Sequence, residues 1–406
     1  MTSPRDPLRT LLLALIYPHR AAYYDDWLDS FHQSPAFDTT TANLLELAPA
    51  DLARSLDEHD LVILHHSCLA DTIGELGPFS PVLAERRRAR LAAFVGNEYN
   101  SPYVPMAEKR ALLRACRPDI IATQLLLEAG LFLYEDLGAQ VIALPHALNP
   151  AAYPRGPAPA ARKTDIGVRN FRYSPLLGDE ERNAIIDYFQ RHGPDHGLVT
   201  DIDFEQRFSR DQWAAFLRRC RGTVSSEAGS WYLDRDDALM REVAAYVAAN
   251  RSRLVLDDNA PLRGLVRRLP LPVKSVIAWM LRHGPVKYAG MEDAKLDFDE
   301  LYERFFKHAP RCPAYSKAIS SRHFDAIGSG TCQIMIEGRF NDILTPGEHY
   351  LPVRQDYANL EEAIERFKDD AECKRITDAA YAHVMENHTY AHRAAALREA
   401  VEQLPA

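Results

Sequence analysis

Apolar positions along this chain gather in short runs that alternate with helical patterns. In the first part of the sequence, runs of strand length recur at residues 11–16, 61–64, 91–95, 120–122 and 141–144. Apolar strands separated by helices are typical of a parallel sheet with crossover helices, because parallel neighbours need a long connection. The pattern therefore predicts an α/β domain at the N-terminal end.

A proline-rich segment follows this first group of strands and helices and marks the end of the domain. Residues 145–163 read PHALNPAAYPRGPAPAARK and contain five prolines, which resist both helix and strand. A second α/β set follows this linker. Its first strand is expected at 166–168, a helix at 179–192 and a later strand at 222–226.

These patterns predict two Rossmann-like domains that face each other across a cleft. The N-terminal domain is expected to cover residues 1–155 and the C-terminal domain residues 156–385. The pattern turns helical at about 234–313, which we interpret as a helical elaboration of the second domain. Residues 386–406 are expected to form a C-terminal helix that packs back toward the N-terminal domain.

The most informative segment is 320–346, SSRHFDAIGSGTCQIMIEGRFNDILTP. Ser320 or Ser321 can cap a short helix, glycines end it, and an apolar run suited to a strand follows. Asp325 lies in the middle of that helix. A carboxylate there can accept hydrogen bonds from both vicinal hydroxyls of a ribose, so the segment favours a nucleotide site.

The same segment resembles the C-terminal domain of the spore-maturation CgeB-like glycosyltransferases, a branch of the GT-B group. The stretches ANLEEAIERFKDD (358–370) and ENHTYAHRAAALREAV (386–401) are similar to that family's acidic helix and closing helix. The resemblance implies a GT-B fold, with a nucleotide sugar on the C-terminal domain and the acceptor on the N-terminal domain. In many retaining relatives two glutamates hold the donor. Asp325 matches the second of them, whereas Lys317 stands at the first.

Arginines follow the first strand of the second domain. Arg169, Arg172 and Tyr173 fall on the loop before a helix, at the carboxyl edge of the sheet where open α/β sheets bind ligands. Guanidinium groups hold phosphate oxygens in bidentate fashion and offset leaving-group charge. The loop is therefore a candidate for the donor diphosphate. The alternative is that these arginines are ordinary surface charges.

Further donor candidates lie in two other places. Ser226 and Glu227 belong to the small-residue segment 222–229, at the end of the expected strand, where Glu227 can accept from sugar hydroxyls. A plain strand-to-helix turn explains that loop almost as well. The beginning of the 320–346 helix adds Ser321 and Arg322.

Two residues of the first domain are candidates for the catalytic base. Glu98 follows the strand at 91–95, and His146 follows the strand at 141–144. Either side chain can take a proton from an acceptor hydroxyl once burial tunes its pKa. The alternatives are that Glu98 caps a helix and that His146 is a structural histidine of the linker.

The sequence gives little support for a metal or a cofactor. Asp201 with Asp203, and Asp234 with Asp236, echo the DxD pair of metal-dependent transferases, but such short patterns arise often by chance. The six cysteines are widely spaced without a CxxC pair, which argues against a disulfide framework or a zinc site. We expect no metal and no cofactor beyond a nucleotide sugar as co-substrate, and reduced thiols in the cytoplasm.

The net charge of −9 argues against a nucleic-acid partner. Residues 261–290 contrast with it, because they hold six basic and no acidic residues among apolar ones. Such a stretch can lie against anionic lipid at the inner membrane face. It can equally pack on the domain or bind an anionic glycan. No apolar run reaches the roughly 20 residues of a spanning helix.

Together these features predict a metal-independent glycosyltransferase. The acceptor is expected to be a glycan or a lipid-linked glycan in the assembly of a cell-surface polysaccharide or glycoconjugate. Two alternatives stay open: a nucleotide-sugar epimerase of the same fold, and a non-catalytic sugar-binding or scaffolding subunit.

Overall fold

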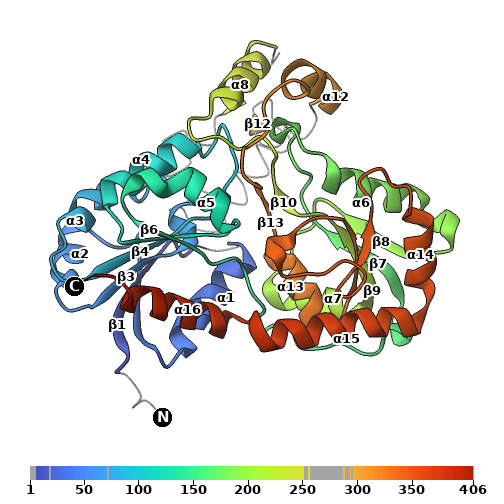
Figure 1. The fold of residues 1–406 in the computed structure, drawn as a ribbon, viewed down its shortest axis with the longest axis horizontal. Coiled ribbons are helices and arrows are strands. Elements are labelled where there is room, and N and C mark those ends of the chain that lie inside the picture. The colour runs from blue at the N-terminus through green and yellow to red at the C-terminus, as the bar shows by residue number, and fades with distance from the viewer. Residues whose placement is uncertain are drawn as a thin grey trace.

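The structure, a computed structural model, describes residues 6–17, 20–70, 73–250, 255–256, 287–288, 293 and 296–405. Its main elements form two parallel β-sheets, each flanked by helices (Figure 1). We call the first sheet with its helices the N-terminal domain, and the second sheet with its helices the C-terminal domain.

The N-terminal sheet runs in the order β2-β1-β3-β4-β5-β6, with every neighbouring pair parallel. Its strands are β1 (Leu8–Ala14), β2 (Phe37–Asn43), β3 (Leu61–Leu64), β4 (Arg90–Phe94), β5 (Ile120–Thr123) and β6 (Gln140–Ala143). Its helices are α1 (Ala22–Gln33), α2 (Pro49–Leu56), α3 (Ser80–Ala84), α4 (Met106–Cys116) and α5 (Leu127–Tyr134).

The C-terminal sheet runs in the order β15-β14-β9-β7-β8 and is also parallel. Its strands are β7 (Thr164–Arg169), β8 (Thr200–Asp203), β9 (Cys220–Ser225), β14 (Cys332–Ile336) and β15 (Leu351–Val353). Its helices are α6 (Glu181–His192), α7 (Arg210–Arg219), α13 (Ser321–Gly328), α14 (Leu360–Lys368) and α15 (Asp370–Asn387).

The five apolar runs of the first domain are all strands, and the run at 61–64 matches β3 residue for residue. The pattern does not predict β2, because its sequence FDTTTAN is mostly polar and only its first residue is buried. This strand lies at the edge of the sheet, where one row of neighbours is missing. Hydrophobic patterns detect central strands better than edges.

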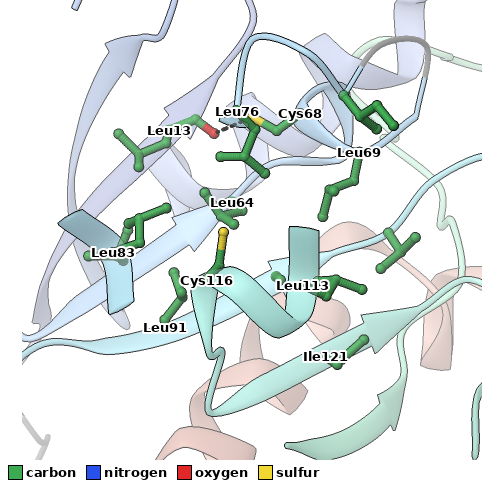
Figure 2. Close-up of a cluster of buried hydrophobic side chains, with 14 of the residues drawn as sticks. Leu13, Leu64, Cys68, Leu69, Leu76, Leu83, Leu91, Leu113, Cys116 and Ile121 are labelled. Atoms are coloured by element: carbon green, nitrogen blue, oxygen red, sulfur yellow. Dashed lines mark hydrogen bonds between the residues drawn. The ribbon is translucent and has the colours of Figure 1, made fainter. Parts of the chain in front are cut away.

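The core of the N-terminal domain lies on both faces of its sheet. Figure 2 shows part of one face, where Leu64, Leu91 and Cys116 pack together; all three side chains are fully buried. The six cysteines of the chain are free thiols, as their spacing predicts. Cys68 donates a hydrogen bond to the carbonyl oxygen of Leu13 at 3.4 Å.

The linker between the two domains is bonded to the place where the chain returns to the N-terminal domain. Helix α15 packs in the C-terminal domain, whereas the last helix, α16 (Tyr390–Glu402), lies beside α1 of the N-terminal domain (Figure 1). Between them the backbone of His388 accepts from the N–H of Leu148 at 3.0 Å, and the N–H of Tyr390 donates to the carbonyl of Leu148 at 3.1 Å. The linker after β6 and the segment between α15 and α16 are thus held together by backbone hydrogen bonds.

Residues that follow the strands of one sheet contact residues that follow the strands of the other. Arg210, which begins α7, bonds to Asp29 (2.6 Å) and Asp26 (3.2 Å) of α1. Asn341, beyond β14, donates to the carbonyl oxygen of Gln124, beyond β5, at 3.0 Å. The ligand-binding edges expected for both sheets therefore face each other.

The expected helical elaboration at 234–313 is described only in part. It includes α8 (Ala238–Asn250), α12 (Phe298–Leu301) and the two-residue strands β11 (Val255–Leu256) and β12 (Lys287–Tyr288). The basic stretch at 261–290, apart from 287–288, lies outside the described residues. Among the helices that the structure describes, none is long and apolar enough to cross a membrane.

Candidate functional site

Helix α13, which the sequence predicts with a cap at Ser320 or Ser321, begins at the carboxyl edge of the C-terminal sheet. Ser320 is its N-cap, and its backbone N–H donates to Nδ1 of His323 at 3.0 Å. The other ring nitrogen of His323 lies 3.2 Å from the hydroxyl of Ser225, at the end of β9. This contact fixes the first turn of α13, which carries Ser321 and Arg322, against the neighbouring strand.

Two arginines come together at this edge. Arg322 lies in the first turn of α13 and donates to Asn170. Arg182 lies in the first turn of α6, is 4% exposed, donates to the carbonyl of Ser226 at 3.2 Å, and stacks over the ring of Tyr173 at 4.3 Å. In the part of the chain that the structure describes, neither guanidinium forms an ion pair, and Nε of Arg182 has no hydrogen-bond partner.

The electrostatics of this pair favour an anion. Burial and, next to it, the positive charge of Arg182 lower the pKa of Arg322 to about 10. The acid whose charge acts on Arg322, Asp325, compensates little, because burial holds its pKa well above the usual range and favours its neutral form. A buried cation beside a half-buried one, both without an ionised partner, is costly unless an anion joins them. A phosphate group meets that need, since guanidinium groups bind it in bidentate fashion.

Asp325 occupies the predicted place on α13 but already has a partner. Its Oδ2 accepts from Nε1 of Trp213 on α7 at 2.9 Å, and the carboxyl group is 5% exposed. Asp26 of the N-terminal domain is close enough for its charge to raise the pKa of Asp325 further. A ribose at Asp325 must therefore use the second carboxyl oxygen or displace Trp213, and its ribose role stays a prediction.

The two arginines that the sequence favours for the diphosphate are engaged elsewhere. Arg169 pairs with Asp201 at 2.6 Å and stacks over Phe216 at 4.4 Å. Arg172 forms a bidentate pair with Asp187 on α6, at 2.6 and 2.8 Å. The third residue of that loop, Tyr173, contacts Arg182 instead.

Arg182 was not among the sequence candidates. The helix ERNAIIDYFQRH looks like an ordinary solvated helix, so its arginines attract no attention. A signal is nevertheless present, because a basic residue in the first turn of a helix opposes the helix dipole. Arg182 stands in that unfavourable position, at an edge where ligands bind.

Lys317, which stands where many retaining relatives have a donor-binding glutamate, has acidic partners in the structure. Its ammonium group is fully buried and lies 2.6 Å from Asp179 and 2.6 Å from Glu181. The charges of those carboxylates raise the pKa of Lys317 against the effect of burial. The lysine is thus neutralised by two acids within its own domain.

Glu227 is likewise held by its surroundings. Its Oε1 accepts from the backbone N–H of Phe340 at 2.6 Å, and its Oε2 accepts from the hydroxyl of Tyr315. Burial raises the pKa of Glu227. The adjacent Ser226 is buried and donates to the carbonyl of Glu227 at 3.1 Å. These contacts shape the loop after β9, and a donor-binding role for both residues stays a prediction.

The two candidate bases lie at the carboxyl edge of the N-terminal sheet. The carboxylate of Glu98 accepts from Gln124 N (2.7 Å), Thr123 Oγ1 (2.8 Å) and the hydroxyl of Tyr134 (2.8 Å). His146 is buried, and its Nδ1 accepts from Nε1 of Trp27 at 3.4 Å. Burial raises the pKa of Glu98 and lowers that of His146 to about 3. Neutral His146 has the protonation state of a base, whereas Glu98 is occupied in holding the turn after β5.

Neutral buried histidines should make part of the stability depend on pH. Burial lowers the pKa of His65 to about 3, against about 6.5 in an unfolded chain. Its contribution is therefore fully present above pH 6.5 and is lost as the pH falls toward 3. His65→Asn keeps an acceptor for Ser67 N but cannot titrate, so its stability deficit relative to the native protein should shrink on acidification. Urea unfolding at several pH values measures the difference; a deficit that is constant with pH would contradict the assignment.

The DxD-like aspartates have local partners. Asp201 pairs with Arg169 and Arg219, and Asp234 accepts from the backbone N–H groups of Asp236 and Asp237. Over the described residues, no cluster of three or more histidine, cysteine, aspartate or glutamate side chains has the geometry to hold a metal ion.

Comparisons with known proteins agree with this architecture. Residues 301–399 match the sequence model of a family described as glycosyl transferase-like. No curated protein matches the chain in sequence. Among solved structures, it is similar to Anabaena Alr3699/HepE in complex with UDP and glucose, with a TM-score of 0.50 at 11% identity over 98% of this chain and 100% of that one. It is also similar to an alpha-glucosyltransferase in complex with UDP and a 13-mer DNA containing an HMU base, with a TM-score of 0.50 at 10% identity over 98% and 100% of the two chains. The chain therefore has the GT-B fold of two Rossmann-like domains.

Proposed function

We propose that this protein is a glycosyltransferase that takes a sugar from a nucleoside-diphosphate donor bound to its C-terminal domain. The observation that carries the proposal is the pair formed by buried Arg182 and half-buried Arg322, which meet without an ionised carboxylate at the ligand-binding edge of the sheet. The glycosyl transferase-like match over 301–399 includes α13, and the two similar structures contain UDP.

In this mechanism the arginines stabilise the departing diphosphate. Breaking the bond between the sugar and the phosphate oxygen leaves negative charge on the diphosphate, and fixed cations in a buried site stabilise that charge strongly. Ser320 and the first N–H groups of α13 add the positive end of a helix. His146, at the facing edge, is the candidate of the N-terminal domain for taking the proton of the acceptor hydroxyl; burial lowers its pKa to about 3, so it is neutral but a weak base until the bound acceptor changes its surroundings.

The finer assignments belong to the same proposal. We infer a CgeB-like enzyme with a glycan or lipid-linked glycan as acceptor, in the synthesis of a cell-surface polysaccharide or glycoconjugate. Release of free sugar from a nucleotide sugar, and a larger product when acceptor is present, would support this. A changed nucleotide sugar without acceptor would indicate the epimerase. An inert but sugar-binding protein would indicate the scaffolding subunit.

Turnover should persist in excess chelator, because arginine side chains and a helix N-terminus would do the work of a divalent ion. The measurement is donor hydrolysis with and without EDTA. Loss of activity that magnesium or manganese restores would contradict the metal-independent mechanism.

A further inference from the structure

The loop after β14 contains an unusual backbone turn. Phe340, Asn341 and Asp342 have φ angles of 45°, 55° and 59°, so three consecutive residues other than glycine are left-handed. Asparagine and aspartate tolerate this region, but phenylalanine rarely adopts it. Such a conformation persists only where the surrounding contacts hold it in place.

Those contacts come from the loop after β9 and from Tyr315. Glu227 accepts from the N–H of Phe340 at 2.6 Å, and the N–H of Arg339 donates to the Tyr315 hydroxyl at 3.2 Å. A side chain at Gly338 would lie 2.2 Å from Glu227 Oε2, so this close approach requires glycine. The turn is therefore built to present its middle residue, Asn341, in one orientation.

Asn341 reaches both domains with its amide group. Its Oδ1 accepts from the N–H of Ile319 at 2.8 Å, directly before the N-cap of α13. Its Nδ2 donates to the carbonyl oxygen of Gln124 in the N-terminal domain at 3.0 Å. The N–H of Gln124 in turn donates to Glu98 at 2.7 Å, so the partner is itself firmly held.

A second contact runs in parallel with this bridge. Arg339, the residue before the turn, pairs with Glu128 of α5 at 2.7 Å. A turn that served the C-terminal domain alone would need only the bond to Ile319. The bond to Gln124 ties the same side chain to the other domain.

We propose that Asn341 is a positioning residue that couples docking of the N-terminal domain to the placement of the α13 N-terminus, and with it Arg322. The inference rests on the proposed function in taking Arg322 as a donor-phosphate ligand. The donor site is then completed only when the two domains are engaged, which links donor binding to the presence of the acceptor-binding half.

The test compares Asn341→Asp with a matched variant, Asn359→Asp. The acid keeps the acceptor for Ile319 and tolerates a left-handed backbone, but it cannot donate to Gln124. Asn359 has the same bonding pattern within one domain, since it accepts from Arg354 N at 2.8 Å and donates to Pro352 O at 3.0 Å. Asn341→Gly serves as a second variant, because glycine relieves the backbone strain while removing both bonds.

Hydrogen exchange of the full-length protein without ligand is the first readout. Asn341→Asp and Asn341→Gly should each exchange about fivefold to tenfold faster at both 123–128 and 319–325, the effect of one lost hydrogen bond, while Asn359→Asp should leave both segments unchanged. Calorimetry with UDP is the second readout, and both Asn341 variants should bind it about fivefold more weakly. Unchanged exchange at 123–128 would overturn the coupling. A native protein that ignores UDP would instead overturn the proposed function, because the exchange result does not depend on nucleotide.

Discussion

Arg322→Gln and Arg182→Gln are each expected to slow donor turnover about 100- to 1,000-fold, the usual cost of removing one preorganised group that stabilises transition-state charge. The reason is that Arg182 is buried and Arg322 half-buried at the ligand-binding edge, each without an ionised carboxylate, so their positive charge is available to the diphosphate. Glutamine keeps a polar side chain of similar reach but removes the charge. The measurement is release of UDP from UDP-glucose or from the best of a panel of nucleotide sugars.

Arg375→Gln is the matched control, because Arg375 is an exposed arginine of α15 that pairs with Glu372 within its own helix. It should turn over donor like the native protein. The contrary result would be normal turnover in the Arg322 and Arg182 variants together with slow turnover in Arg172→Gln. That outcome would place the diphosphate on the loop after β7, as the sequence pattern alone suggests.

Lys317→Met is expected to destabilise the fold by about 3–5 kcal/mol, because it leaves Asp179 and Glu181 without their cation in a buried site. The deficit should depend on pH. Burial already raises the pKa of Asp179, and without Lys317 its folded form takes up a proton more readily than the unfolded chain does. The deficit should therefore shrink as the pH falls from about 7.5 to about 5.5.

Urea unfolding of both proteins at the two pH values measures this difference. Lys163→Met is the control, since Lys163 is exposed and has no ion pair in the described part of the chain; it should change stability by less than about 0.5 kcal/mol. A deficit for Lys317→Met as small as that of the control would show that the buried acids find other partners. It would also reopen Lys317 as a ligand for the donor.

The sequence predicts the fold well where burial is complete. Strand β3 is apolar throughout and matches its predicted range, and strand β14 is fully buried, apolar except for Gln333, and lies within the predicted segment 320–346. The edge strands β2 and β8 are polar or only half-buried, so the hydrophobic pattern does not contain them. The predicted N-cap at Ser320 depends only on neighbouring residues in the sequence, and it is confirmed.

The site is less predictable, because it depends on which charges find partners. Arg169 and Arg172 are well placed in sequence, yet Asp201 and Asp187 reach them only through the packing of neighbouring elements. A charged side chain is available to a ligand only when no such partner neutralises it. Arg182 belongs to the site because no carboxylate reaches it in the described structure, and no spacing in the sequence records that.

A crystal structure with bound UDP tests the central claim most directly. The account predicts the diphosphate between Arg182 and Arg322, against the first turn of α13 and beside Tyr173, with the ribose on the side of Asp325. Well-ordered UDP bound at another place, or crystals soaked in millimolar UDP whose arginine pair holds no diphosphate, would contradict it.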